Sequence, residues 1–217
     1  MKKIFCMILS VFLFAGCSNN FQKEVSGNLS NAAETSAYAA LSNQMYGWGL
    51  KKNVNAPPDI PDSTKKLMQQ YNAYYIDTVP RSLYLTFDEG YENGYTAKIL
   101  DVLKENDVKA AFFITGPYLE KEEELVRRMV EEGHIVGNHT VNHPSMPEVK
   151  DDEKLKKEIT ELNHTFKEKF GQDMKYIRPP KGEYSERTLA LSNDLGYTSV
   201  FWSFAYKDWD TKKQKGT

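Results

Sequence analysis

The stretch Val108-Lys-Ala-Ala-Phe-Phe-Ile-Thr115 decides the fold class. It is apolar almost without interruption, and such a run is typical of a strand in a parallel sheet that is covered on both faces. The sequence therefore predicts a buried parallel strand near the middle of the domain.

Strand and helix patterns alternate on both sides of this stretch. Helical spacing of apolar residues is clearest in the long charged segment 151–170, where Leu155, Ile159, Leu162 and Phe166 form one stripe. The predicted strands are 82–87, 108–115, 134–138, 175–178 and 199–205, and the predicted helices are 97–105, 122–132, 151–170 and 185–195. This alternation predicts an α/β fold with a parallel sheet, and five strands are too few to close an eight-stranded barrel.

Three short motifs follow predicted strands: Thr86-Phe-Asp-Glu-Gly90, His139-Thr-Val-Asn-His143 and Arg178-Pro-Pro-Lys-Gly182. The carboxyl ends of strands are where parallel α/β folds place their chemistry. The motifs supply a carboxylate pair, two histidines four residues apart and an arginine. These are the parts of a metal-assisted hydrolase.

Each motif also has a plainer interpretation. His139 and His143 would share one face of a helical turn and could bind one divalent metal, most often zinc, but any two histidines can be surface or core residues. Asp88 and Glu89 are adjacent on a strand, so they should point to opposite sides, although Asp-Glu-Gly is also common in solvated turns. The planar fork of Arg178 suits a carboxylate, or it lies on a proline-stiffened surface loop.

The order and the amino-acid sequences of the motifs resemble those of the polysaccharide deacetylases of the NodB type, carbohydrate esterase family 4. The resemblance runs from about Tyr46 to Thr217. It implies a distorted, incomplete (β/α) barrel. It also implies that Asp88 is the general base, that Arg178 holds Asp88 in place, and that a divalent metal, Zn²⁺ in our prediction, is bound.

In the resembled family, the metal ligands are two histidines and an aspartate, which here correspond to His139, His143 and Glu89. The glutamate is one methylene longer than the aspartate it replaces. The resemblance further implies that Asp208 orients Arg178. It also gives the predicted substrate contacts, which are Tyr184, Trp209 and Pro179. Trp209 could equally be an exposed loop residue.

Three segments narrow the substrate: Tyr46-Gly-Trp48, Tyr91-Glu-Asn-Gly-Tyr-Thr96 and Phe201-Trp-Ser-Phe-Ala205. They look like the muramic acid de-N-acetylases of endospore formers. The implied partner is a peptidoglycan glycan strand, deacetylated at N-acetylmuramic acid on the way to the muramic δ-lactam of spore cortex. Two alternatives stay open: a peptidoglycan N-acetylglucosamine deacetylase, and a catalytically impaired glycan-binding lipoprotein.

One catalytic residue of the resembled family, the general acid, has no counterpart in this sequence. The resembled family takes its general acid from a histidine in a late Leu-x-His motif, which does not occur here. The remaining candidate, His164, lies mid-helix among polar residues and is predicted to be a surface residue. We expect a piece of a longer enzyme, truncated before closure of the barrel, with a shortened natural protein of poor activity as the alternative.

The N-terminal residues predict export. Residues 1–17 read as a signal peptide with a lipobox that ends at Cys17, which would carry lipid; an ordinary cleaved signal peptide is the alternative. Residues 18–45 are predicted to be a flexible tether, 46–80 an extension packed on the domain, and 81–217 the partial deacetylase domain. The predicted location is the outer face of the cell membrane or the cell wall.

Composition sets the remaining limits. The chain has 217 residues, of which 40% are hydrophobic, which is enough for one domain with a core. Its net charge of −2 gives no reason to expect nucleic acid. The two cysteines, Cys6 and Cys17, both lie in the signal region, so no disulfide framework is expected, and we predict a monomer.

Overall fold

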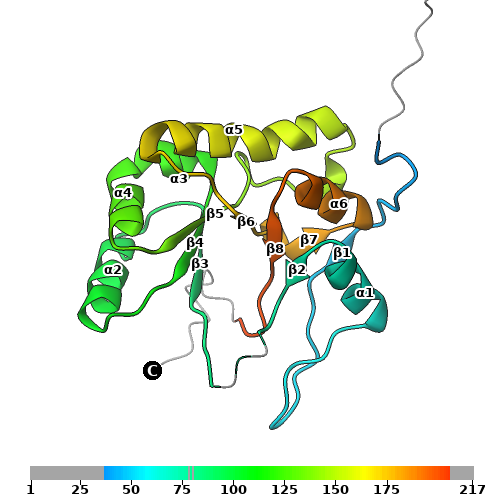
Figure 1. Cartoon of the computed structure of the whole chain (residues 1–217), viewed down its shortest axis with the longest axis horizontal. Coiled ribbons are helices and arrows are strands. Elements are labelled where there is room, and N and C mark those ends of the chain that lie inside the picture. The colour runs from blue at the N-terminus through cyan, green and yellow to red at the C-terminus, as the bar shows by residue number, and fades with distance from the viewer. Residues whose placement is uncertain (1–36, 78, 80, 206–217) are drawn as a thin grey trace, which may run out of the picture. The chain divides into compact units, whose positions relative to one another are not determined.

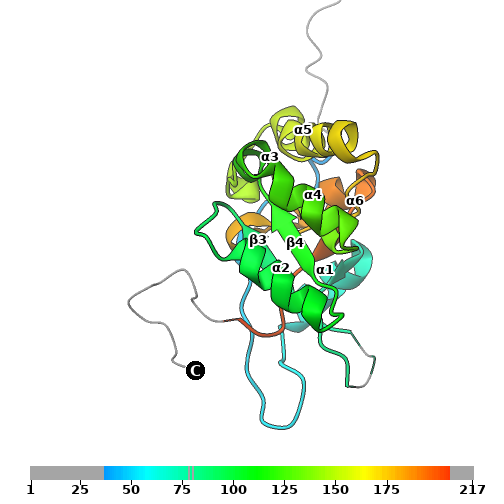
Figure 2. The same cartoon turned by 90° about the vertical axis from the view of Figure 1, so that its left-hand side faces the viewer.

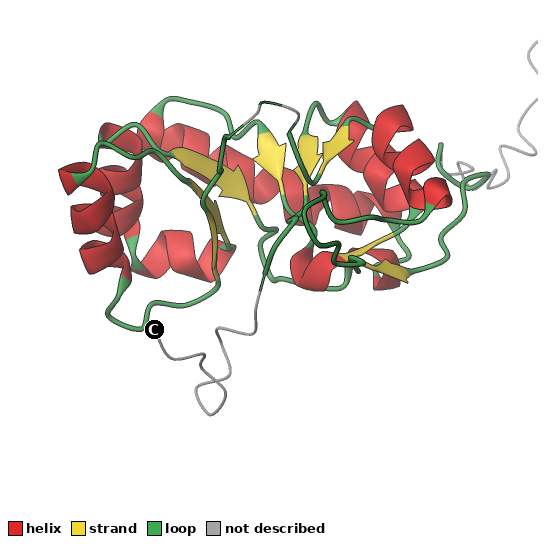
Figure 3. Cartoon of the chain, turned by 90° about the horizontal axis from the view of Figure 1, so that it is seen from below, coloured by secondary structure: helices red, strands yellow, loops and turns green. Residues whose placement is uncertain are grey.

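The structure, a computed structural model, describes residues 37–77, 79 and 81–205 (Figure 1). Its centre is a parallel sheet with the strand order β2-β8-β6-β5-β4-β3. The strands are β2 (Ala73–Tyr74), β3 (Thr86–Glu89), β4 (Ala111–Ile114), β5 (Ile135–Asn138), β6 (Tyr176–Ile177) and β8 (Thr198–Val200). Since β2 and β3 are not paired with each other, the sheet is a curled, open half-barrel, and the predicted α/β incomplete barrel is confirmed (Figure 3).

Helices cover the outer side of the sheet. They are α1 (Asp62–Gln70), α2 (Thr96–Glu105), α3 (Gly116–Lys121), α4 (Glu123–Glu131), α5 (Asp152–Phe170) and α6 (Glu186–Asp194). Figures 1 and 2 show α2, α3 and α4 gathered beside β3 and β4, with α5 across the top. Within the described residues, no helix is long and apolar enough to cross a membrane.

The longest helix, α5, shows how the sequence specifies these elements. The side chain of Asp151 caps its first turn by accepting a hydrogen bond from the backbone N–H of Lys154 at 2.9 Å. Gly171 ends the helix in a left-handed conformation at φ 71°, which glycine adopts without steric cost. The four residues of the predicted stripe are all buried. Each such side chain contributes about 1.5–3 kcal/mol through burial.

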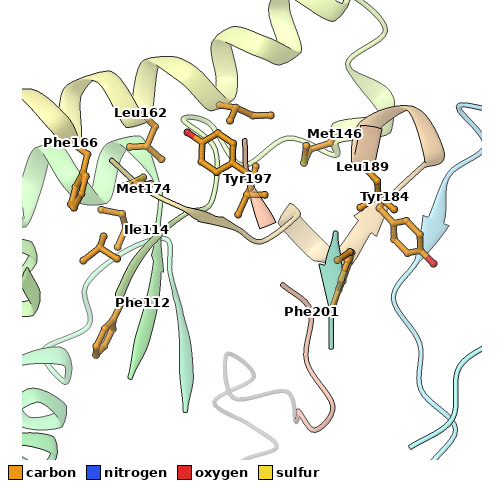
Figure 4. Close-up of a cluster of buried hydrophobic side chains, with 14 of the residues drawn as sticks. Phe112, Ile114, Met146, Leu162, Phe166, Met174, Tyr184, Leu189, Tyr197 and Phe201 are labelled. Atoms are coloured by element: carbon orange, nitrogen blue, oxygen red, sulfur yellow. The ribbon is translucent and has the colours of Figure 1, made fainter. Parts of the chain in front are cut away.

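The core lies between these helices and the sheet. Figure 4 shows Phe112 and Ile114 of β4 in the same cluster as Leu162 and Phe166 of α5. The predicted apolar strand is therefore central, with Phe112, Phe113 and Ile114 all buried.

Residues before β3 also pack on the sheet. Trp48 stacks on Phe201 with ring centroids 4.3 Å apart, and its indole Nε1 donates to the carbonyl of Trp202 at 2.9 Å. Strand β1 (Tyr46–Gly47) pairs antiparallel with β7 (Glu183–Tyr184). The edge strand β2 comes from this segment too and pairs in parallel with β8.

All five predicted strands are longer than the observed ones, most of all at the start of the first and at the end of the last. The strand predicted at 82–87 is β3, which begins only at Thr86, and Leu83 is largely exposed. The strand predicted at 199–205 ends at Val200, where the next carbonyl turns toward Arg178. The positions of Cys17, Asp208 and Trp209 lie outside the described residues.

Candidate active site

The three motifs meet at one end of the sheet. Asp88 lies on β3, His139 follows β5 directly, and Arg178 follows β6 directly. Strands β6, β5, β4 and β3 are consecutive neighbours and run parallel, so their carboxyl ends share one edge. Side chains that are far apart in the sequence are therefore brought together there.

Phe113 of β4 provides the floor of this site. It is paired in register with Asp88 on one side and Gly137 on the other, so all three belong to the same face of the sheet. A Cβ atom at Gly137 would lie 2.5 Å from the ring of Phe113, so only glycine fits there. The guanidinium carbon of Arg178 lies 4.2 Å from the ring centroid, a cation–π distance.

The side chain of Arg178 donates hydrogen bonds to three acceptors. Its Nη1 donates to Oδ1 of Asp88 at 2.7 Å, its Nε to the carbonyl of Val200 at 3.1 Å, and its Nη2 to the carbonyl of Phe201 at 3.5 Å. The arginine side chain is buried, whereas the aspartate is 38% exposed. The charge-assisted contact thus fixes a carboxylate that solvent and substrate can still reach.

His139 is held in one orientation. Its Nδ1 lies 2.8 Å from the carbonyl oxygen of Arg178, an acceptor, so Nδ1 carries the proton and Nε2 keeps its lone pair. Nε2 lies 3.9 Å from Oδ2 of Asp88. Burial lowers the pKa of His139 to about 4, against the opposing effect of the Asp88 charge, so the ring is neutral at neutral pH.

His143 reaches the same site through a loop. The prediction of a helical turn over 139–143 was wrong, because Thr140 and His143 adopt positive φ angles of 64° and 55°. Asn138 accepts from the backbone N–H of Thr140 at 2.8 Å, and Thr140 Oγ1 accepts from the N–H of His143 at 3.0 Å. The two imidazole centroids are 4.7 Å apart.

Glu89 does not join the histidines. It is paired in register with Ile114, which belongs to the helix-covered core, so its side chain leaves β3 on the face opposite to Asp88. It is buried there near Tyr118 of α3, where its charge, after burial of the ring itself, helps to raise the phenol pKa. Among the described residues, no three His, Cys, Asp or Glu side chains are grouped to hold a metal ion. The ligand role of Glu89 stays a prediction.

The other predicted residues are placed as follows. Tyr184 is buried, and its hydroxyl lies 3.1 Å from that of Thr64. Pro179 is also buried, and its carbonyl accepts from the N–H of Gly182 at 3.0 Å. Substrate contact by either residue stays a prediction. His164 is exposed on α5 with its Nε2 3.2 Å from Glu168, so it lies on the surface as expected.

The histidine pair fits a divalent metal. Burial is the main cause that lowers the pKa of both imidazoles. The neutral imidazole is the form that binds a metal ion. The contact of His139 Nδ1 with a backbone carbonyl is the arrangement that orients metal-binding histidines in general. Asp88 lies beside the pair, so a bound metal and a fixed carboxylate would face the same substrate atom.

Sequence reasoning missed Phe113, Asn138 and Trp202. The ring centroid of Trp202 lies 5.8 Å from the guanidinium carbon of Arg178. The side-chain amide of Asn138 donates to the carbonyl of Ile159 at 2.8 Å. Asn138 could have been predicted from the sequence, because an amide at the end of a buried strand, directly before a histidine motif, needs hydrogen-bond partners. Phe113 could be identified only from the strand register.

Comparison with known proteins gives the family. A family model described as polysaccharide deacetylase matches residues 76–200. An uncharacterised 30.6 kDa protein of Geobacillus stearothermophilus is 46% identical over 216 residues, which cover 98% of this chain and 74% of that protein. The peptidoglycan-N-acetylmuramic acid deacetylase PdaA of Bacillus subtilis is 43% identical over 180 residues, 82% of this chain and 68% of the relative.

A solved structure agrees with these relatives. That of Bacillus subtilis PdaA, described as a family 4 carbohydrate esterase, superimposes with a TM-score of 0.77 at 41% identity and covers 81% of this chain and 76% of the other. The fold, the three strand-end motifs and the relatives lead to one assignment. The chain belongs to the polysaccharide deacetylases of carbohydrate esterase family 4, hydrolases that act on carbon–nitrogen bonds.

Proposed function

We propose that this chain removes the acetyl group from N-acetylmuramic acid in peptidoglycan glycan strands. The observation that carries the proposal is the Asp88 carboxylate, which is fixed by Arg178 and faces the neutral ring of His139. The choice of muramic acid is supported by the relative whose name states that substrate.

The side chains suit hydrolysis of an amide. Arg178 occupies Oδ1 of Asp88, so Oδ2 is the oxygen that accepts a proton from the attacking water. The water oxygen bonds to the acetyl carbonyl carbon, the carbon–nitrogen bond then breaks, and the nitrogen takes the proton that Oδ2 received from the water and leaves as the free amine. A divalent metal on His139 and His143 would polarise the carbonyl. The products are acetate and a muramic acid residue with a free amino group.

Finer assignments belong to the same proposal. Zn²⁺ is the metal expected for two histidines. The free amine can close on the lactyl carboxylate of the same sugar, which would yield the muramic δ-lactam of spore cortex. Lipid on Cys17 would hold a monomeric domain at the outer face of the membrane, within reach of the glycan.

The test is acetate release from peptide-stripped glycan strands in the presence of Zn²⁺. Asp88→Asn should lower the rate by about 100-fold or more while leaving bound metal unchanged, because it removes a base and no histidine. Asp101→Asn is the matched control, since this exposed carboxylate pairs with Arg128. Glycan binding by the wild type without acetate release would favour a binding protein, and release only from chitooligosaccharides would favour N-acetylglucosamine as substrate.

A further inference from the structure

The loop that carries His143 has a strained backbone. His139 directly follows β5, and its ring is fixed by the carbonyl of Arg178 at 2.8 Å. His143 lies four residues further on, so its place depends on the backbone in between. In that backbone, Thr140 and His143 itself have left-handed φ angles of 64° and 55°, which are unfavourable for residues with a Cβ. Such a backbone persists only where its surroundings fix it, and it is frequent at functional sites.

The middle of α5 holds this loop. The backbone N–H of Val141 donates to the carbonyl of Glu158 at 2.9 Å. The side-chain amide of Asn138 donates to the next carbonyl of the helix, that of Ile159, at 2.8 Å. The carbonyl of Val141 in turn accepts from the N–H of Gly116 at 3.0 Å. None of these three bonds uses a side chain of α5, so they place the start of the loop whatever residue occupies position 158.

The carboxylate of Glu158 adds a two-point contact directly before His143. Its Oε2 accepts from the backbone N–H of Asn142 at 2.8 Å, and its Oε1 accepts from the side-chain amide of Asn142 at 2.7 Å. Hydrogen bonds to an ionised group are stronger than neutral ones. Asn142 is exposed, so this contact adds little to the core. Its effect falls on the conformation of the loop.

We propose that Glu158 is a positioning residue for the metal site, which holds the 139–143 loop in the conformation that brings the imidazole of His143 beside that of His139. The proposal rests on the proposed function, in which both rings bind one metal ion. The ring centroids are 4.7 Å apart, and one zinc ion requires each ligating nitrogen at about 2.0–2.1 Å. A loop that relaxes toward ordinary φ angles would move His143 out of this arrangement and leave His139 where β5 and Arg178 hold it.

Binding of Zn²⁺ to the full chain, measured without substrate by competition with a chromophoric chelator, tests this role. Glu158→Ala should raise the Kd for Zn²⁺ by about tenfold, the lower end of the range for groups that orient a metal ligand. Glu158→Gln should lose less, because its side-chain oxygen can still accept from the backbone N–H of Asn142. Glu161→Ala removes an exposed carboxylate from the same helix, so it is the control for charge and should leave the Kd unchanged.

Two further measurements separate positioning from folding. Alanine has the highest helix propensity, so Glu158→Ala should unfold at no lower urea concentration than Glu161→Ala. Asn142→Ala should raise the Kd for Zn²⁺ in part, since it removes one of the two bonds to the carboxylate. The double variant Glu158→Ala with Asn142→Ala should bind Zn²⁺ as weakly as Glu158→Ala alone, because both substitutions break the same contact.

Four results would overturn the proposal. They are Zn²⁺ binding by Glu158→Ala as tight as in the wild type, an equal loss of affinity in Glu161→Ala, losses that simply add in the double variant, and no binding of Zn²⁺ by the wild type. A loss of affinity that comes with a lower urea midpoint would also count against it. A Zn²⁺ affinity that depends on Glu158, in a protein that releases no acetate, would support the positioning role and reject the proposed function instead.

Discussion

Arg178 binds Asp88 through its guanidinium and His139 through its backbone carbonyl, at 2.7 Å and 2.8 Å. One residue therefore fixes both the position of the carboxylate and the tautomer of the buried imidazole. The side chain of Arg178 positions Asp88 and its backbone carbonyl orients His139, so a substitution of the side chain can remove the first role and keep the second.

Arg178→Lys should lower acetate release by about 100-fold or more and leave metal binding intact. A lysine cannot reach Asp88 and the carbonyls of Val200 and Phe201 together, so the carboxylate loses its fixed position, whereas the backbone carbonyl that orients His139 is retained. The check is kcat together with bound metal measured by atomic absorption. A variant with normal kcat would show that Asp88 does not need this arginine.

The metal affinity of single variants distinguishes residues that bind the metal from residues that do not. His139→Ala should abolish binding of Zn²⁺, because it removes one of two neighbouring imidazoles. Glu89→Gln should change the affinity by less than about threefold if the carboxylate stays on the helix-covered face with Ile114. Zinc titration by calorimetry compares the two variants. A loss in Glu89→Gln as large as that in His139→Ala would establish Glu89 as the third ligand.

The sequence predicted the sheet because its signals were local. The nearly uninterrupted apolar run at 108–115 predicted a strand buried on both faces, and Phe112, Phe113 and Ile114 are buried. The helices with clear apolar stripes were predicted at nearly their observed bounds. Helix α3 was missed because Gly116 and Pro117 are typical of a turn. It forms because Thr115 accepts a hydrogen bond from the N–H of Tyr118, which is then buried.

The sequence predicted which residues form the site better than it predicted how they are arranged. Strand-end motifs on neighbouring parallel strands must converge, so Asp88, His139 and Arg178 could be grouped without a structure. The loop that carries His143 depends on backbone N–H groups that donate to the side chains of Asn138 and Thr140 and stabilise left-handed backbone. No periodic sequence pattern predicts these hydrogen bonds. The face taken by Glu89 depends on where β3 begins, which a strand pattern of this length does not fix.

His134 should make stability depend on pH. Its ring is buried, and Nδ1 accepts from the backbone N–H of Ala110 at 3.2 Å, a bond that only the unprotonated nitrogen can make. Burial lowers its pKa from the ordinary 6.5, against the opposing charge of Glu132. The unfolded chain therefore binds more protons just below pH 6.5, and stability is lost as the pH falls from 6.5 toward the lowered pKa.

Urea unfolding at pH 7, 6 and 5 measures this dependence. His134→Gln should lose less unfolding free energy than the wild type between pH 7 and 5, because the variant no longer has this titrating ring. His139 and His143 contribute with the same sign in both proteins and cancel in the comparison. Parallel pH profiles for the two proteins would rule out His134 as a source of acid sensitivity.

Arg187 should be among the most destabilising positions outside the site. It is buried on α6, and its Nε donates to Oδ1 of Asp152, in the first turn of α5, at 2.7 Å. Its remaining nitrogens donate to the carbonyls of Val149 and Lys150 at 3.0 and 3.1 Å. Arg187→Met would remove the arginine that pairs with the Asp152 carboxylate, whose side chain is only 10% exposed, and would leave two carbonyls without this donor. The expected loss is about 3–5 kcal/mol of unfolding free energy.

Arg127→Met is the matched control for that loss. Arg127 also pairs with a carboxylate, Glu123, but both side chains are about a third exposed, so its removal should cost less than about 1 kcal/mol. The double variant Arg187→Met with Asp152→Leu should recover part of the loss, because it also removes the carboxylate that loses its arginine in the single variant. Both comparisons use urea midpoints. Equal losses in Arg187→Met and Arg127→Met would mean that α5 and α6 are joined by apolar packing rather than by this ion pair.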